Sequence, residues 1–81
     1  MVRVRLGGTL NSLAGGKTEF EVEATNIREM LDGLGEVCPQ LKPVLAKGVA
    51  VSVDGEIYRG SWFQPVTPES EIYILPALAG G

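Results

Sequence analysis

Apolar and charged residues alternate along the first third of the chain. Val2, Val4 and Leu6 alternate with two arginines, and residues 19–23 alternate in the same way with three glutamates. Strict alternation is typical of strands that have one buried and one solvated face. Antiparallel pairing would set arginines beside glutamates on the solvated face, which favours one register. We therefore predict an N-terminal hairpin whose connection, residues 7–17, curls back over the edge of the sheet.

One amphipathic helix is predicted after this hairpin. Within residues 27–34, apolar side chains recur at i, i+3, i+4 and i+7, which is the spacing of one helix face. Residues 25–26 offer an N-cap, and Glu29 is placed as in a capping box. We expect Gly33 or Gly35 to end the helix.

The second half of the chain predicts three further strands. In residues 49–53, valines alternate with an alanine and a serine, which predicts a strand. Asp54-Gly55 is typical of a tight turn and leads into a short strand at 57–58. The last strand is expected at 71–75, where a nearly continuous apolar run suits a central position in the sheet.

The order of these elements predicts a single α+β domain. Once the helix crosses the apolar face of the hairpin, the later strands must join the sheet on the open side of the first strand. The last strand then lies beside the first and parallel to it, in a mixed sheet with one main helix packed on one face. Eighty-one residues suffice for one core. We expect a folded domain over residues 1–75 and a flexible tail over residues 76–81.

Charge and composition argue against several classes of function. Seven basic and ten acidic residues give a net charge of −3 with no basic cluster, so nucleic-acid binding is disfavoured and a basic protein partner is more plausible. No segment resembles a signal peptide or a membrane span. These features predict a cytoplasmic protein that binds neither nucleic acid nor a membrane.

Cys38 is the only cysteine, and the chain has no histidine. An internal disulfide, a cysteine-ligated cluster and a zinc site are therefore excluded. Without a histidine base, Cys38 is expected to be a buried apolar side chain and not a nucleophile. The segment 16–18, Gly-Lys-Thr, matches the end of a phosphate-binding loop, but it lacks the first glycine of that motif and precedes a strand instead of a helix. We expect no bound cofactor or metal.

The end of the chain carries the strongest functional signal. Pro76 follows the last strand and has no backbone N–H to donate to a neighbouring strand. The residues beyond it are small or aliphatic, and the last two are glycines. Gly80 and Gly81 lack Cβ atoms and so present the terminal α-carboxylate on an unhindered stem. Residues 76–81 would span roughly 20 Å if extended, which is long enough to enter the active site of another protein.

Apolar side chains near the tail are candidate contacts for a partner. Ile72 and Ile74 should face the helix, which turns Tyr73 and Leu75 to the opposite face of the sheet. One ring of the pair Trp62-Phe63 is expected to cap the core while the other stays on the surface near the sheet. The candidate partner-binding residues are Phe63, Tyr73, Leu75, Pro76, Ala77, Leu78, Ala79 and Gly80.

Three segments and the order of the elements together carry a family resemblance. The segments are 10–15 (LNSLAG), 49–55 (VAVSVDG) and 74–81 (ILPALAGG). With this layout, essentially the whole chain resembles the ubiquitin-like β-grasp sulfur carriers of the MoaD/ThiS group. The ending looks especially like that of carriers serving cysteine synthesis, whereas the body is about equally like molybdopterin-synthase small subunits. Residues 68–71 depart from many of the latter, which often carry an Asp-Gly turn there.

The resemblance implies a β-grasp fold and a carrier that is not itself an enzyme, although it may be the small subunit of one. In that family, a ubiquitin-activating-like adenylyltransferase uses ATP to adenylate the C-terminal glycine. A sulfur donor protein then allows a thiocarboxylate to form, and this group gives sulfur to an accepting enzyme in molybdopterin, thiamine or cysteine biosynthesis. Carried over to this chain, Gly81 is the modified residue and the apolar residues before it are the threaded tail.

Two other functions remain open at this point. A ubiquitin-like protein modifier would join Gly81 to a lysine, and it begins with adenylation of the same glycine. A non-reactive β-grasp adaptor would use the glycines only as a flexible end. Intact mass separates the first alternative from a carrier, and extension of the chain beyond Gly81 separates the second.

Overall fold

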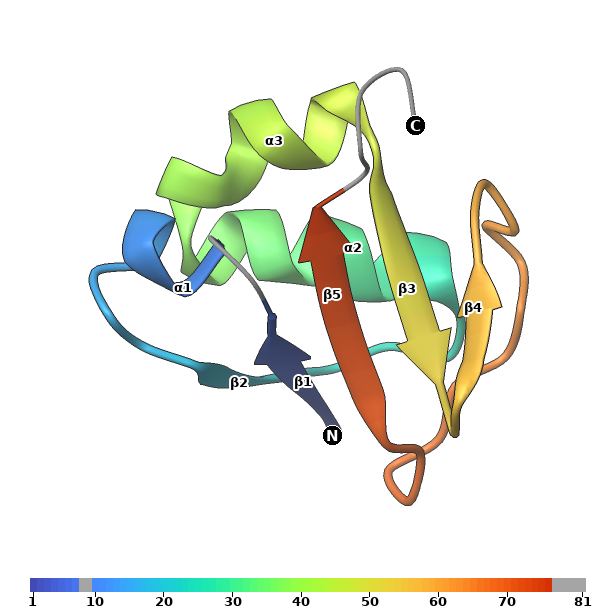
Figure 1. The fold of residues 1–81 in the computed structure, drawn as a ribbon. Helices are drawn as coiled ribbons and strands as arrows, with labels where there is room; N and C mark the ends of the chain where they lie inside the picture. Colours follow the sequence, from blue (N-terminus) through green and yellow to red (C-terminus); the bar gives the residue numbers. More distant parts are fainter. Residues whose placement is uncertain (8–9, 77–81) are drawn as a thin grey trace.

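A five-stranded mixed sheet with its helices on one face forms the body of the protein (Figure 1). The computed structural model describes residues 1–7 and 10–76, with the side chain of residue 11 excepted. The elements in chain order are β1 (Val2–Leu6), α1 (Leu10–Leu13), β2 (Glu19–Val22), α2 (Ile27–Val37), a 3₁₀ turn η1 (Pro39–Leu41), α3 (Lys42–Lys47), β3 (Val49–Val53), β4 (Glu56–Tyr58) and β5 (Ile72–Pro76).

The strand order is β2-β1-β5-β3-β4, which places β5 in the centre of the sheet. β5 pairs parallel with β1 and antiparallel with β3. The predicted parallel pairing of the first and last strands is therefore confirmed. β5 is shifted by one residue from the predicted 71–75, since it begins at Ile72 and ends at Pro76, which lies opposite Val49 in the ladder with β3.

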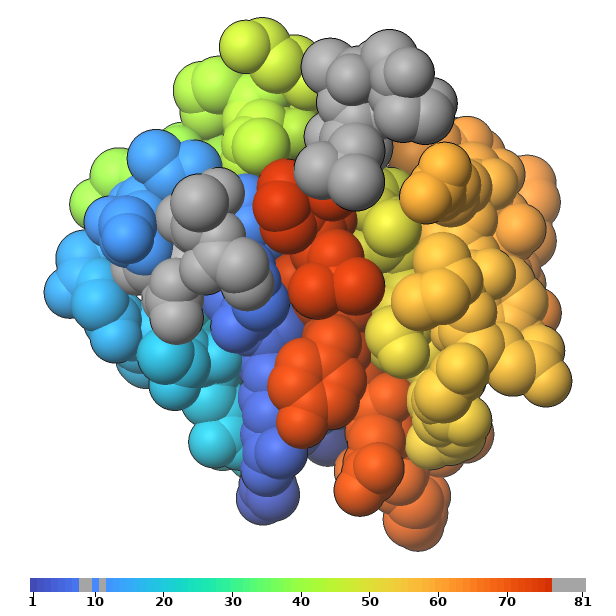
Figure 2. Space-filling view, in the orientation of Figure 1, coloured from blue at the N-terminus to red at the C-terminus, as the bar shows by residue number. Residues whose placement is uncertain are grey.

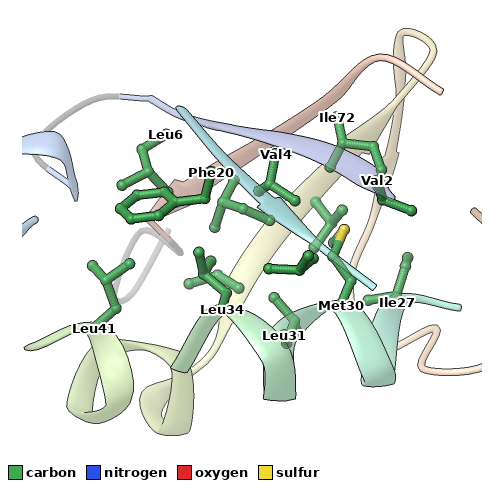
Figure 3. Close-up of a cluster of buried hydrophobic side chains, with 14 of the residues drawn as sticks. Val2, Val4, Leu6, Phe20, Ile27, Met30, Leu31, Leu34, Leu41 and Ile72 are labelled. Carbon is green, nitrogen blue, oxygen red and sulfur yellow. The ribbon is translucent and has the colours of Figure 1, made fainter. Parts of the chain in front are cut away.

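The core lies between the sheet and α2 (Figure 3). Alternate residues of β1, β2 and β5 are buried against the helical layer, as the alternating pattern predicts. The buried stripe of α2 consists of Ile27, Met30, Leu31 and Leu34. Leu41 from the 3₁₀ turn and Leu10 from α1 complete the layer, each about 1% exposed or less. In the connection between β1 and β2, Leu10 thus reaches the core while Leu13 stays exposed.

The start of α2 is capped as its sequence predicts. The Asn26 side chain accepts a hydrogen bond from the Glu29 backbone N–H at 2.8 Å. The Glu29 carboxylate accepts from both the backbone N–H and the hydroxyl of Thr25, also at 2.8 Å. The bond to Asn26 satisfies a donor that a helix N-terminus leaves without a partner. The two hydrogen bonds from Thr25 hold the pKa of Glu29 below its ordinary value.

The predicted end of α2 at Gly33 or Gly35 is wrong, since the helix continues to Val37. Packing explains both glycines. A Cβ at position 33 would lie 3.3 Å from the Cβ of Val22, and a Cβ at position 35 would lie 3.2 Å from the Cγ of Lys42. The two glycines therefore allow β2 and α3 to approach α2 closely, which offsets their low helix propensity.

Candidate functional site

Helices cover one face of the sheet, and the opposite face is open (Figure 2). A row of register partners crosses this open face from β1 through β5 and β3 to β4. Arg5 pairs with Tyr73, Tyr73 with Ser52, and Ser52 with Ile57. The exposed side of β5 therefore lies in the middle of an accessible surface with mixed polar and apolar character.

Tyr73 is held in place on the open face by Arg5. The guanidinium donates from Nη1 to the Tyr73 hydroxyl oxygen at 3.1 Å, and its central carbon lies 5.8 Å from the centroid of the ring. The hydrogen bond from the charged form raises the pKa of Arg5 above its ordinary value. Because Tyr73 remains 39% exposed, its ring is positioned by the fold and is still accessible to a partner.

The side chain of Leu75 lies over Gly7 at the end of β1. A Cβ at position 7 would lie only 2.5 Å from Cδ2 of Leu75, so glycine is what leaves room for this leucine. The backbone N–H of Gly7 donates to the Ile74 carbonyl at 2.8 Å and extends the parallel ladder. Leu75 is thus half-buried on the open face, two residues after Tyr73.

The predicted pairing of arginines with glutamates is confirmed in register, with Arg3 opposite Glu21 and Arg5 opposite Glu19. The ion pair that forms is diagonal, from Nε of Arg3 to Glu19 at 2.9 Å. Both side chains are largely exposed, so this pair contributes little to stability. Arg5 is left to contact Tyr73.

The predicted tail residues lie mostly outside the described residues. Pro76 is the last residue of β5 and is half-buried. Ala77, Leu78, Ala79, Gly80 and Gly81 fall outside the part of the chain that the structure describes. Of the predicted apolar patch, the structure therefore brings together Tyr73 and Leu75 on one face of β5.

The prediction that Trp62 or Phe63 caps the core is wrong. Trp62 is 43% exposed and Phe63 is 75% exposed. The backbone of this segment is tied to the start of α2, because the Arg28 N–H donates to the Trp62 carbonyl at 2.9 Å. Val66, three residues after Phe63, is buried in the core instead. Phe63 is therefore an exposed aromatic residue in a segment that is hydrogen-bonded to α2. It is not part of the strands that pair with β5.

Cys38 is buried, as predicted, at the C-terminal end of α2. Its Sγ donates to the side-chain oxygen of Gln40 at 3.5 Å. Within residues 1–7 and 10–76, no three His, Cys, Asp or Glu side chains cluster closely enough to hold a metal ion. None of the helices in the described part of the chain is long and apolar enough to cross a bilayer.

Arg5 and Gly7 are the site residues that sequence reasoning missed. A sequence feature points to each of them. Arg5 is one of the alternate residues of β1 that face away from the core, and Gly7 directly follows that strand. The parallel register places Arg5 beside Tyr73, and only the packing at the end of the strand shows that Leu75 lies over Gly7.

The profile of the ThiS family matches residues 4–81, which is nearly the whole chain. The chain therefore belongs to the ThiS family, and it is a ubiquitin-like sulfur carrier with the β-grasp fold. Small proteins of this type are carriers and are generally not enzymes themselves.

Solved structures that share this fold include the following two. One is from the crystal structure of the Amycolatopsis orientalis BexX/CysO complex, with 25% identity, a TM-score of 0.77 and full coverage of both chains. The other is SAMP1 from Haloferax volcanii, with 22% identity, a TM-score of 0.73 and coverage of 99% of this chain and 98% of that one. A comparison with curated proteins found no match.

Proposed function

We propose that this protein carries sulfur as a thiocarboxylate on Gly81 and donates it, in the cytoplasm, to an enzyme of cofactor or cysteine biosynthesis. The observation that carries this proposal is the ThiS-family match, which runs to residue 81 and so includes the glycine pair. The central position of β5 supports it as well, because the chain leaves the sheet from a strand that is paired on both sides. The cofactor made in such a pathway would be molybdopterin or thiamine.

The chemistry needs two steps because a carboxylate is a poor electrophile. First, a carboxylate oxygen of Gly81 attacks the α-phosphorus of ATP, and pyrophosphate leaves. Second, a sulfide equivalent from the sulfur donor attacks the carbonyl carbon, and AMP leaves with the former carboxylate oxygen. The product is a thiocarboxylate whose sulfur is the nucleophile that the accepting enzyme uses. In this proposal the chain supplies position and recognition, while the partner proteins supply the catalytic groups.

The open face beside β5 is the surface we propose for recognition by the activating enzyme. Tyr73 is positioned by Arg5 and Leu75 is seated over Gly7, so two apolar groups are preorganised on the strand that leads to the tail. Preorganised aromatic and aliphatic anchors lose little conformational entropy on binding. The similar chain CysO was crystallised in a complex with BexX, which is consistent with a carrier that acts by docking on a second protein.

The test is intact mass spectrometry after incubation with the cognate activating enzyme, ATP and sulfide. We expect a mass gain equal to the replacement of one oxygen by sulfur, located on Gly81 by fragmentation. A variant without Gly81 should fold normally and gain no sulfur, and Gly80→Val should fold but load poorly because a β-branched residue crowds the threaded tail. The control is Cys38→Ser, which should load like the wild type because Cys38 is buried.

Three results would contradict the proposal. Sulfur on Cys38 would make the thiol the carrying atom. A covalent adduct with a second protein through Gly81, with no thiocarboxylate, would indicate a protein modifier. A variant extended by one residue beyond Gly81 that still supports the sulfur-accepting enzyme would indicate a non-reactive adaptor.

A further inference from the structure

A groove with a volume of about 410 Å³ lies between α2 and α3, on the helical side of the sheet. Its apolar lining comes from Leu31, Leu45, Ala46 and the exposed indole of Trp62. Gly35 also lines the groove and adds no side chain to it. From Arg28 to Gly35 the groove follows α2 for about 10 Å. This length suits a short stretch of peptide chain.

The indole of Trp62 is presented to this groove by a fixed backbone. The Arg28 N–H donates to the Trp62 carbonyl, and the Ile27 N–H donates to the Gln64 carbonyl at 3.0 Å. Gln64 in turn donates to the Ser61 carbonyl at 3.1 Å. An aromatic side chain that is nearly half exposed and carried on an anchored turn is typical of a binding anchor.

The rim of the groove is locally basic on a protein whose net charge is −3. Arg28 lies beside Trp62 near the start of α2, and Lys42 lies beside Gly35 at the start of α3. Neither side chain forms an ion pair with any of the described residues. Asp32 lines the groove one helical turn beyond Arg28, between the two cations. Carboxylates are therefore favoured at the two ends of the groove and disfavoured in its middle.

We propose that this α2–α3 groove binds a short peptide segment of a partner protein, in which a large apolar side chain enters the groove and acidic residues flank it. The flanking carboxylates meet Arg28 and Lys42, while the apolar side chain packs against Trp62 and Leu45. Because the groove lies on the helical side, a partner bound there leaves the open sheet face accessible. This site is separate from the one proposed for sulfur transfer and does not depend on that proposal.

The test uses a capped synthetic peptide, Asp-Asp-Leu-Phe-Asp-Asp, and a matched peptide in which every Asp is replaced by Lys. Trp62 is the only tryptophan, so its fluorescence reports directly on the groove, and amide shifts of Arg28, Gly35 and Ala46 locate the bound peptide. We expect saturable binding of the acidic peptide that weakens as salt concentration rises, and much weaker binding of the lysine peptide.

Two variants of α3 form a matched pair. Lys42→Glu reverses a charge on the rim and should weaken binding of the acidic peptide about five- to tenfold. Lys47→Glu makes the same charge change on the same helix outside the groove and should have little effect. A variant lacking residues 77–81 should bind the peptide as the wild type does, which separates this site from the tail.

Four results would overturn the proposal. The first is the absence of a saturable shift at the groove up to roughly 5 mM acidic peptide, the range of a weak docking contact. The second is equal binding of the two peptides, and the third is equal loss of binding in the two lysine variants. The fourth is a concentration-dependent shift at the groove without peptide, which would make a second copy of this chain the occupant.

Discussion

Along β5, Ile72 and Ile74 point into the core, whereas Tyr73 and Leu75 lie on the opposite face of the sheet. The inward residues contact only the interior of the protein. The outward residues are held by Arg5 and Gly7 and remain accessible in part. Because successive residues of a strand point to opposite faces of the sheet, β5 contributes both to the core and to the open face. Substitutions on the two faces should accordingly change different measured properties.

The largest expected effect is on stability, from Ile74→Ala. Ile74 is fully buried in the central strand, so truncation leaves a cavity and should lower the free energy of unfolding by about 2–5 kcal/mol. Denaturant unfolding measures this change. At low temperature, where the variant is still folded, sulfur loading should continue. A change below about 1 kcal/mol would place Ile74 outside the core.

The opposite result is expected from Leu75→Glu. Leu75 is half-buried on the open face, so the fold should tolerate the change better than a core substitution. The proposed contact with the activating enzyme should suffer, with kcat/KM for sulfur loading reduced at least about tenfold, the effect of losing one interface anchor. Steady-state loading kinetics and thermal unfolding, measured on the same sample, separate the two effects. Normal loading would remove this face from the recognition surface.

A smaller effect is expected from Gly7→Ala, because the new Cβ would lie 2.5 Å from Cδ2 of Leu75. The leucine must rotate away, and stability should fall by about 1 kcal/mol as part of its apolar surface returns to water. The methyl chemical shifts of Leu75 should move. In a Leu75→Ala background the same glycine substitution should be nearly neutral, and an equal loss in both backgrounds would contradict the contact.

The smallest effect concerns the exposed N-cap of α2, which is not part of β5. Hydrogen bonds from Thr25 lower the pKa of Glu29, so the unfolded state binds a proton more readily than the folded state does. The stability that this carboxylate contributes is present above its unfolded pKa and is lost as the pH falls through its folded pKa. The difference in Tm between wild type and Glu29→Gln should therefore be largest near neutral pH and shrink at acidic pH. A difference independent of pH would contradict the cap.

Much of this arrangement could be predicted from the sequence. The alternation in Val2–Leu6 and in Ile72–Pro76 indicated which residues face α2, and both patterns match the observed burial. An N-cap at residue 25 or 26 could be predicted in the same way, because a cap depends on residues only three apart in the chain, and the structure shows that Asn26 is the capping residue. Local periodicity determines these features, so a single sequence contains the information.

The remaining features depend on contacts between distant segments. Gly33 and Gly35 look like helix ends until β2 and α3 are seen packed against them. One ring of the pair Trp62-Phe63 is expected in the core from the sequence, but both are exposed and Val66 is buried there instead. The contact between Arg5 and Tyr73 spans 68 positions and requires the register of the parallel pair. For the tail beyond Pro76, the predictions from the sequence stand as predictions.

The position of β5 also has a mechanical consequence. A partner that draws the chain beyond Pro76 into its active site pulls along the axis of β5. That strand is hydrogen-bonded to β1 on one side and to β3 on the other, so the load acts on both ladders together and along their length. An edge strand has only one neighbour, and under the same pull it could come away from that neighbour by breaking one hydrogen bond at a time. The domain can therefore be held by its end under tension while the sheet stays intact.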